Sequence, residues 1–327
     1  MTQALSDLGL DGPVALAPMA GITDLPFRRL VARFGAGMVV SEMVASREMV
    51  QDRRAARARA ASGVPGAASA IQLAGREAHW MAEAARMAEA DGARLIDINF
   101  GCPAKKVTGG QSGAALMRAP DHALQLVEAV VGAVRVPVTV KMRLGWDDAS
   151  LNAPEIARRA EDAGVRLVTI HGRTRCQLYR GRADWAAIAR VRARVRIPVL
   201  ANGDITDTAA ARAAMAASGA DGVMVGRGVQ GAPWTLARIT AGLRGGPVPD
   251  APAGAALLDL IAAHYEDMIA FYGTDPGLRV ARKHLGWYMD RAAVPEALRR
   301  PVLTAATPQA ALSRLRAAMA DAGACAA

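Results

Sequence analysis

Eight short apolar runs, each followed by a longer segment of helical composition, constrain the fold of this chain more than any other feature. They are rich in Val, Ile, Leu and Met, and each is bounded by glycine, proline or a charged residue. The runs are Val14 to Met19, Met38 to Met43, Ala70 to Ala74, Leu95 to Phe100, Val136 to Met142, Leu167 to His171, Ile197 to Ala201 and Gly222 to Val225. Continuous apolar strands that alternate with helices are typical of a parallel sheet covered by helices. Eight such units close a (β/α)8 barrel, or TIM barrel, which takes about 250 residues.

Internal similarity supports this interpretation. The segment 134–138 is echoed by 195–199, and 91–95 is echoed by 163–167, each time where a helix ends and a strand begins. A doubly wound open sheet is the alternative, but its roughly six strands would leave two of the runs unplaced. The fold class predicted is therefore a TIM barrel.

The chain of 327 residues is longer than a barrel requires. Residues 244–254 are rich in glycine and proline, which is typical of a linker. After them no strand pattern returns, and Ala255 to Tyr272, Pro276 to Arg291 and Pro308 to Ala322 have helical spacing. The sequence predicts a catalytic barrel over 1–243, a linker over 244–254 and a small all-helical domain over 255–327.

Charge and cysteine content limit the kinds of partner and the cellular compartment that fit this chain. The formal net charge is +10, an excess that favours a polyanionic partner, although solvated arginine-rich helix faces are the alternative. Cys102, Cys176 and Cys325 are too few and too scattered for a disulfide framework or a C-x-x-C metal site. The first ten residues do not read as a signal peptide, and no apolar run is long enough to span a bilayer. We expect a reduced, cytoplasmic protein with no membrane partner.

The stretch from Asn99 to Arg118 carries the strongest chemical signal. An apolar strand ends at Asn99, and Cys102 follows in a loop with Pro103, two lysines and several glycines. A free cysteine is most often a buried filler, but this one is poorly placed for packing. Cys102 is thus the candidate catalytic residue, and Cys176 and Cys325 are treated as incidental.

Polar residues follow all eight predicted strands, where a barrel builds its site. The last two loops, at Asn202-Gly203-Asp204 and Gly226-Arg227-Gly228, combine close backbone approach with a guanidinium, as a phosphate site requires. The second loop also matches G-x-G-x-x-G, but no further strand with a terminal acid follows it, which argues against a dinucleotide fold. Lys141 has an alternative reading as a Schiff-base lysine. The histidines have no metal-ligand spacing, so no metal site is predicted.

These residues carry a resemblance to a known family. Asn99, Gly101-Cys102-Pro103 and Lys105-Lys106, together with Ala281 to Tyr288, resemble the tRNA-dihydrouridine synthases, most closely their bacterial B-type subgroup. The resemblance covers nearly the whole chain. It implies an FMN cofactor, NADPH as reductant and tRNA as partner. The residues that it assigns to the cofactor are Pro18, Met19, Ala20, Gln72, Lys141, His171, Asn202, Gly203, Asp204, Gly226 and Arg227.

The resemblance also implies a reaction. Reduced flavin delivers hydride to C6 of a uracil, and Cys102 protonates C5. Asn99 and Arg143 are expected to bind the base. The remaining candidates for RNA contact are Arg173, Arg175, Arg279, Arg282, Lys283, His284 and Tyr288. Of these, Arg279, Arg282 and Lys283 have the i, i+3, i+4 spacing of one helix face.

Two other functions stay open at this point. A barrel flavoenzyme that reduces a free pyrimidine shares the hydride chemistry but does not need a basic helical domain. A nonenzymatic RNA-binding protein explains the charge but not the polar strand ends. The sequence does not specify the uridine position, although the subgroup resemblance favours position 17, nor the oligomeric state or a protein partner.

Overall fold

A computed structural model, which describes residues 3–322, shows a closed barrel of parallel strands. The barrel strands are β1 (Val14–Leu16), β2 (Met38–Val40), β4 (Ala68–Ala74), β5 (Leu95–Phe100), β6 (Val138–Arg143), β7 (Leu167–His171), β8 (Val199–Asn202) and β9 (Gly222–Val225). They pair in the order β2-β1-β9-β8-β7-β6-β5-β4, and β2 pairs with β4 to close the ring. The predicted TIM barrel is confirmed. A two-residue strand that the sequence did not reveal, β3 (Val44–Ala45), lies along the end of β4.

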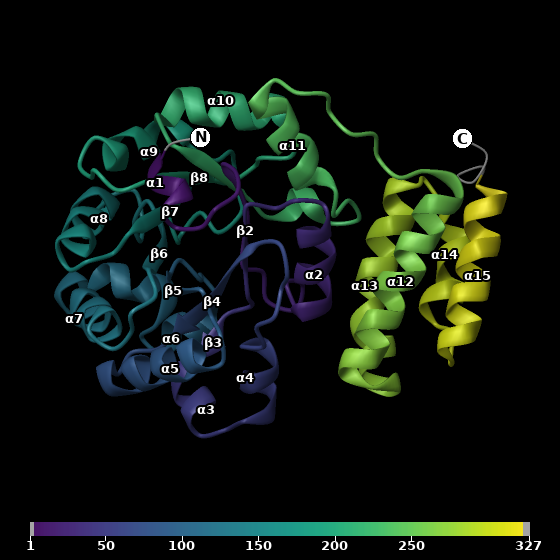
Figure 1. The fold of residues 1–327 in the computed structure, drawn as a ribbon, viewed down its shortest axis with the longest axis horizontal. Coiled ribbons are helices and arrows are strands. Elements are labelled where there is room, and N and C mark those ends of the chain that lie inside the picture. Colours follow the sequence, from purple (N-terminus) through teal and green to yellow (C-terminus); the bar gives the residue numbers. More distant parts are fainter. Residues whose placement is uncertain (1–2, 323–327) are drawn as a thin grey trace.

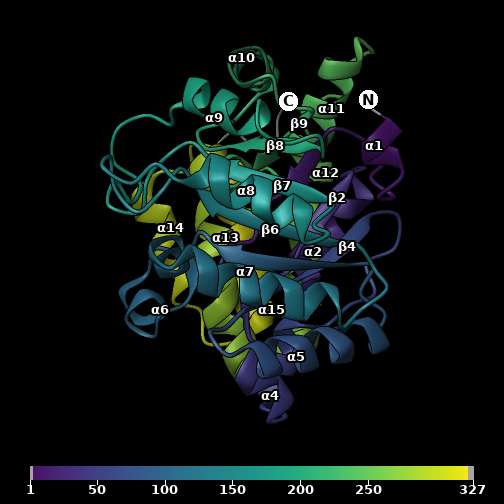
Figure 2. The same ribbon diagram turned by 90° about the vertical axis from the view of Figure 1, so that its left-hand side faces the viewer.

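Helices surround the barrel and follow its strands (Figures 1 and 2). They are α1 (Gln3–Ser6), α2 (Leu25–Arg33), α3 (Ser46–Val50), α4 (Arg54–Arg59), α5 (Ala78–Ala90), α6 (Lys105–Gly109), α7 (Pro120–Val131), α8 (Ala153–Asp162), α9 (Trp185–Arg192), α10 (Thr208–Ser218) and α11 (Thr235–Arg244), with the 3-10 helices η1 (Gly113–Arg118) and η2 (Arg227–Val229). Side-chain caps fix several starts. Asp24, Asp184 and Asp207 accept the backbone N–H three residues on, at the starts of α2, α9 and α10.

Alternate residues of each strand point to opposite faces of the sheet, and both faces are buried. On β5, Ile96, Ile98 and Phe100 pack in the layer between the sheet and the helices. Leu95 instead lies in a second apolar cluster that also holds Leu5, at the amino-terminal end of the barrel interior. Asp97 and Asn99 share the parity of Leu95, so polar groups follow the apolar cluster up the interior toward the carboxyl ends of the strands. The open mouth of the barrel is therefore at that end.

The C-terminal part of the chain is helical. It contains α12 (Gly254–Tyr272), α13 (Thr274–Arg291), α14 (Glu296–Leu303) and α15 (Pro308–Asp321), which share one hydrophobic core. Three of these helices were predicted and α14 was not. Residues 246–253 form neither helix nor strand. Among the described residues, none of the helices is long and apolar enough to cross a membrane.

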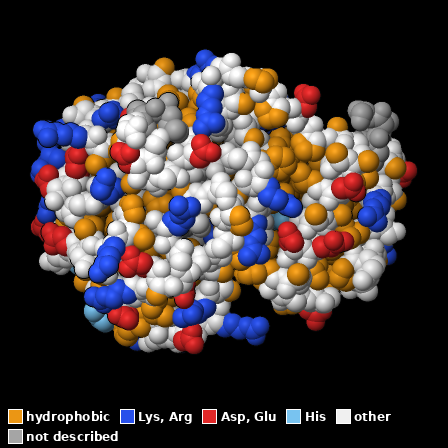
Figure 3. Space-filling view, viewed as in Figure 1, with side chains coloured by type: hydrophobic (Ala, Val, Ile, Leu, Met, Phe, Trp, Pro, Cys, Tyr) orange, Lys and Arg blue, Asp and Glu red, His pale blue; other side chains and the backbone are white. Residues whose placement is uncertain are grey.

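The helical part packs on the barrel beside α2 (Figure 1). Phe27 of α2 contacts two histidine rings that also contact each other, with centroid distances of 5.6 Å to His264 and 5.4 Å to His284. The Tyr272 hydroxyl, at the end of α12, donates to Asp24 over 3.0 Å. In Figure 3 the two parts appear as adjoining lobes, with Lys and Arg side chains scattered over this face of the barrel.

Candidate active site

Cys102 lies in the loop that leaves β5, and its side chain is half-buried. The Asn99 side chain holds the loop, because Oδ1 accepts the N–H groups of Cys102 (2.9 Å) and Gly101 (3.1 Å). On the other side, the carbonyl of Cys102 accepts the N–H of Ala114 (3.0 Å). Gly113 has φ +61, and a Cβ there would lie 2.8 Å from the Cys102 carbonyl oxygen. The loop therefore has a defined backbone path that needs glycine at 113.

Gln72 and Asn99 lie side by side at the ends of β4 and β5. The Asn99 Nδ2 donates to the Gln72 Oε1 over 2.7 Å, and both side chains are buried. Both polar atoms of the Asn99 amide thus form hydrogen bonds, Nδ2 with Gln72 and Oδ1 with the Cys102 loop. The prediction that Asn99 binds a base stays a prediction, and the structure gives this residue a role in shaping the loop.

Lys141 and His171 lie on the neighbouring strands β6 and β7 at the mouth of the barrel. Lys141 is half-buried on β6, and burial, with Arg143 nearby, lowers the pKa of its ammonium to about 8. Burial also lowers the pKa of His171 well below its usual value, and the positive charges of Lys141 and Arg143 act in the same direction. The imidazole is therefore neutral at pH 7 and can donate one hydrogen bond and accept another.

Arg143 ends β6 and is buried. Its Nε donates to the Gly101 carbonyl (2.9 Å), and one terminal nitrogen donates to the carbonyls of Thr174 (2.8 Å) and Leu178 (2.9 Å). Burial lowers the pKa of Arg143 to about 10, which leaves it charged at neutral pH. Its guanidinium ties the Cys102 loop to the loop after β7.

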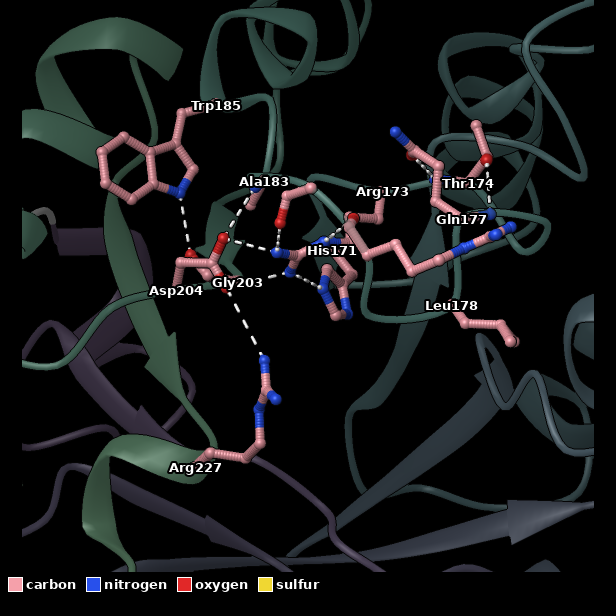
Figure 4. A network of polar contacts seen from close by, with 12 residues as sticks. His171, Arg173, Thr174, Gln177, Leu178, Ala183, Trp185, Gly203, Asp204 and Arg227 are labelled. Carbon is pink, nitrogen blue, oxygen red and sulfur yellow. Dashed lines mark hydrogen bonds and ion pairs between the residues drawn. The ribbon is translucent and has the colours of Figure 1, made fainter.

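The buried Arg173 makes a bidentate ion pair with the partly exposed Asp204, with distances of 2.9 and 2.6 Å (Figure 4). Arg173 also donates to the Gly181 carbonyl at 2.6 Å, and Asp204 accepts the N–H of Ala183 at 2.7 Å. Partial burial acts to raise the pKa of Asp204, but hydrogen bonds from Arg173 and Ala183 outweigh it and lower that pKa. Arg173, predicted to contact the substrate, is in fact only 2% exposed and holds the two loops together.

Arg227 has a different environment from Arg173. Its side chain is 58% exposed, and it reaches from the loop after β9 to within 3.8 Å of Asp204 (Figure 4). Its guanidinium also lies 5.0 Å from the ring centre of Tyr179, an exposed aromatic residue that the sequence did not single out. Arg227 therefore keeps donors available at the mouth.

The remaining predicted cofactor residues surround the same opening. Pro18 and Met19 are half-buried after β1, and Ala20 is exposed. A Cβ built at Gly226 would lie 3.7 Å from the Met19 sulfur, so the ends of β1 and β9 are neighbours. Asn202 is buried and donates to the Met224 carbonyl over 2.8 Å. Gly203 has φ +115, and a Cβ there would lie 3.0 Å from the His171 ring, which leaves space for glycine only.

The residues predicted to bind RNA separate into two groups. Arg279 and Arg282 are exposed on α13, and the Lys283 ammonium lies beside the backbone of Gly21, 3.2 Å from where a Cβ would be. Arg175 is half-buried, with its guanidinium 4.6 Å from the Trp146 ring centre. Lys283 and Arg175 therefore adjoin loops that follow barrel strands, and Arg279 and Arg282 are exposed on the same helix as Lys283.

His284 and Tyr288 form the second group, which the structure buries, and their contact with the substrate stays a prediction. They are 1% and 2% exposed, because the opposite face of α13 packs on α12 and on the barrel. The Tyr288 hydroxyl lies 3.0 Å from the His264 Nδ1. Helical spacing puts residues on one face but does not say which neighbour covers it.

Asp97 is the residue of this region that sequence reasoning missed. It lies two positions before Asn99, on the same side of β5, and contacts Gln72 and Thr139. The sequence did contain a signal for it, because Asp97 is an acidic residue inside an apolar run and shares the strand face of Asn99. No cluster of three or more His, Cys, Asp or Glu with metal-binding geometry occurs among residues 3–322. Cys325 lies outside the described residues.

The fold and the mouth define a class: a (β/α)8-barrel enzyme with a cysteine, a lysine, a neutral histidine and an available arginine at the carboxyl ends of its strands. The chain belongs to the dihydrouridine synthase family, whose model matches residues 15–323. Among similar proteins, a probable tRNA-dihydrouridine synthase of Rhodobacter capsulatus is 62% identical over 98% of this chain and 99% of its own. A tRNA-dihydrouridine synthase B of Xanthomonas axonopodis pv. citri is 46% identical over 93% of this chain and 91% of its own.

These relatives confirm the resemblance that the sequence motifs predicted, including the B-type subgroup. A solved structure of a 2-naphthoyl-CoA reductase complex aligns with a TM-score of 0.54 at 13% identity, over 73% of this chain and 51% of that chain. At that identity the likeness concerns the fold alone.

Proposed function

We propose that this enzyme reduces a specific uridine of tRNA to 5,6-dihydrouridine, with FMN as cofactor and NADPH as reductant. Family membership supports the reaction. The observation that carries the proposal is the meeting of Cys102, Lys141, His171 and Arg227 at one barrel mouth, next to the basic face of α13. A protein that only binds RNA would not need these four side chains at one barrel mouth, so their placement favours an enzyme.

The residues present fit a flavin. Pro18 and Met19 give the mouth an apolar wall, on which a planar ring can pack. Lys141 carries most of its charge at neutral pH and can stabilise a developing negative charge. Arg227 offers an exposed guanidinium beside the two glycine-containing loops, a suitable arrangement for a phosphate. When bound, FMN supplies a hydride to C6 of the uracil.

Cys102 supplies the proton to C5. A thiol carries a dissociable proton, so the side chain can act as a general acid. Asn99 and Arg143 fix the backbone on both sides of Gly101 and so aim the thiol. Lys105 and Lys106 are exposed, one turn beyond the thiol, where they can meet the phosphate backbone of the substrate.

The tRNA binds across the mouth and α13. A uridine in folded RNA must leave its stack before its C5–C6 bond is accessible, which costs a few kcal/mol. Contacts between the phosphates and Arg279, Arg282 and Lys283 offset this cost. Lys283 is the best placed of these, because its ammonium adjoins the loop after β1.

The test is positional mass spectrometry of dihydrouridine in tRNA from a strain that lacks this gene, before and after incubation with the purified protein and NADPH. We expect dihydrouridine to return at one position, with 17 favoured by the resemblance of the sequence motifs to the B-type subgroup. A yellow, flavin-loaded protein that restores no dihydrouridine in tRNA but reduces free uracil or uridine would establish the alternative, a free-pyrimidine reductase. Protein that purifies without flavin and cannot be loaded would refute both.

A further inference from the structure

We propose that Asp97 is a positioning residue for Cys102. Its carboxylate sets the orientation of the Gln72 and Asn99 amides, and through them the backbone of the loop that carries the thiol. The inference rests on the proposed role of Cys102 as proton donor. Asp97 itself lies in the barrel interior, below the mouth, and is 2% exposed.

The chain of hydrogen bonds begins at the Asp97 carboxylate. One oxygen accepts the Thr139 hydroxyl at 2.5 Å, and the other accepts the Gln72 Nε2 at 2.6 Å. An ionised carboxylate has acceptors only. Gln72 must therefore turn its NH₂ group toward Asp97, which leaves its carbonyl oxygen to face Asn99.

The next two links follow from the first. The Gln72 Oε1 accepts the Asn99 Nδ2 at 2.7 Å, so Asn99 must turn its own carbonyl oxygen outward. That oxygen accepts the N–H groups of Gly101 and Cys102. If Asn99 were reversed, its NH₂ group would face those two N–H donors. If Gln72 were reversed, its carbonyl oxygen would face the Asp97 carboxylate and its NH₂ group would face that of Asn99. The charge on Asp97 thus makes the productive direction of both amides the favoured one.

A carboxylate is an unexpected choice for this position on packing grounds. Burial raises the pKa of Asp97 to about 6, and the hydrogen bonds from Thr139 and Gln72 only partly offset that effect. At neutral pH the group is therefore mostly ionised in a place that disfavours the ion. The interior next to it is apolar, with Leu95 and Leu167 fully buried. A leucine would match the polarity of that layer, but it would give Gln72 no acceptor.

Proton transfer depends steeply on geometry, and a misplacement of about 1 Å can cost on the order of a hundredfold in rate. We expect Asp97→Leu to lower kcat for uridine reduction by roughly tenfold to a hundredfold, with KM for tRNA and flavin content unchanged. Asp97→Asn keeps one acceptor and matches the shape, so its loss in kcat should be smaller. We therefore expect kcat to fall in the order wild type, Asp97→Asn, Asp97→Leu. This order indicates that residue 97 acts by accepting a hydrogen bond from Gln72, because a residue that only filled space would not produce it.

A second measurement reports on the loop without the reaction. The purified holoenzymes are alkylated with iodoacetamide, and peptide mass spectrometry compares Cys102 with the exposed Cys176 in the same molecule. We expect the ratio of Cys102 to Cys176 labelling to rise in Asp97→Leu, because the loop is no longer held at the Asn99 end. Thr169→Val is the matched control. This variant removes a buried interior hydroxyl whose Oγ1 has no hydrogen-bond partner among the described residues. It should leave both kcat and the labelling ratio unchanged.

The outcomes separate this inference from the proposed function. Unchanged kcat and an unchanged labelling ratio in flavin-loaded Asp97→Leu would overturn the positioning role. So would a fall in kcat that is matched by loss of flavin, because Gln72 and Lys141 are expected to hold the cofactor and the effect would then act through the flavin and not through Cys102. If Asp97→Leu does not fold, Asp97→Asn decides, and wild-type kcat in that variant refutes the idea. If the wild type itself reduces no tRNA, the proposed function fails, while the labelling ratios still test the control of the loop by Asp97.

Discussion

The contact between the helical part and the barrel should make the protein sensitive to acid, and His264 offers a quantitative test. Its ring is fully buried between Phe27 and His284, and burial lowers its pKa to about 3. In the unfolded chain the pKa is near 6.5. As the pH falls below 6.5 the unfolded state takes up a proton that the folded state does not, so stability is lost between pH 6.5 and 3.

The magnitude follows from the pKa difference. One unit is worth about 1.36 kcal/mol, so lowering the pH from 7 to 5 should cost about 2 kcal/mol of unfolding free energy through His264. Other groups also titrate in this range. His284 and His171, whose pKa values burial lowers, add losses of the same sign. A further group is Asp24, whose pKa burial raises to about 6. Its effect has the opposite sign, because the folded state takes up its proton first. A comparison of variants cancels such contributions.

The assay is urea unfolding, followed by circular dichroism, at pH 7 and pH 5 for the wild type and His264→Leu. The leucine variant loses the bond to Tyr288 and is expected to be less stable at pH 7, but its stability should fall by about 2 kcal/mol less than that of the wild type on going to pH 5. His79→Gln, at an exposed histidine, is the control and should behave as the wild type. Equal losses in the wild type and His264→Leu would refute the reasoning.

Three further predictions follow from the site. Cys102→Ala should keep its flavin spectrum and bind tRNA normally but reduce uridine on the order of a hundredfold to ten-thousandfold more slowly in single-turnover assays, and wild-type rates would remove Cys102 from the mechanism. Lys283→Ala should weaken tRNA binding and reduce the slope of log K against log salt by roughly 0.7 to 0.9, whereas an unchanged slope would place the phosphates elsewhere. Arg173→Met leaves Asp204 without its bidentate partner; we expect a loss of about 3 kcal/mol in urea unfolding, near the lower end for buried pairs because the Asp204 side chain is 31% exposed, and a loss under about 0.5 kcal/mol would contradict the pairing.

The barrel was readable from the sequence because its signals are local. Each apolar run is a strand of the ring, and the polar residue that ends it, such as His171 or Asn202, is placed at the mouth by the parallel topology itself. The Cys102 loop was equally visible, since cysteine, proline, lysine and glycine in one short stretch disfavour packing. The short β3 and the helix α14 were not, because neither has enough residues for a periodic pattern to stand out.

Tertiary structure decided which polar residues meet. Gln72, Asp97 and Thr139 are 25 and 42 positions apart along the chain, and only the lateral register of β4, β5 and β6 brings them into one network. The same holds for α13. Its spacing predicted a helix with a basic face, but the packing of α12 and the barrel determined that Arg279 stays exposed and His284 does not. Periodicity is a property of a single element, whereas burial depends on the neighbour that covers it. The sequence by itself therefore determined the elements, their order and the residues at the strand ends. The closure of the barrel and its packing against the helical part determined which of these residues contact one another.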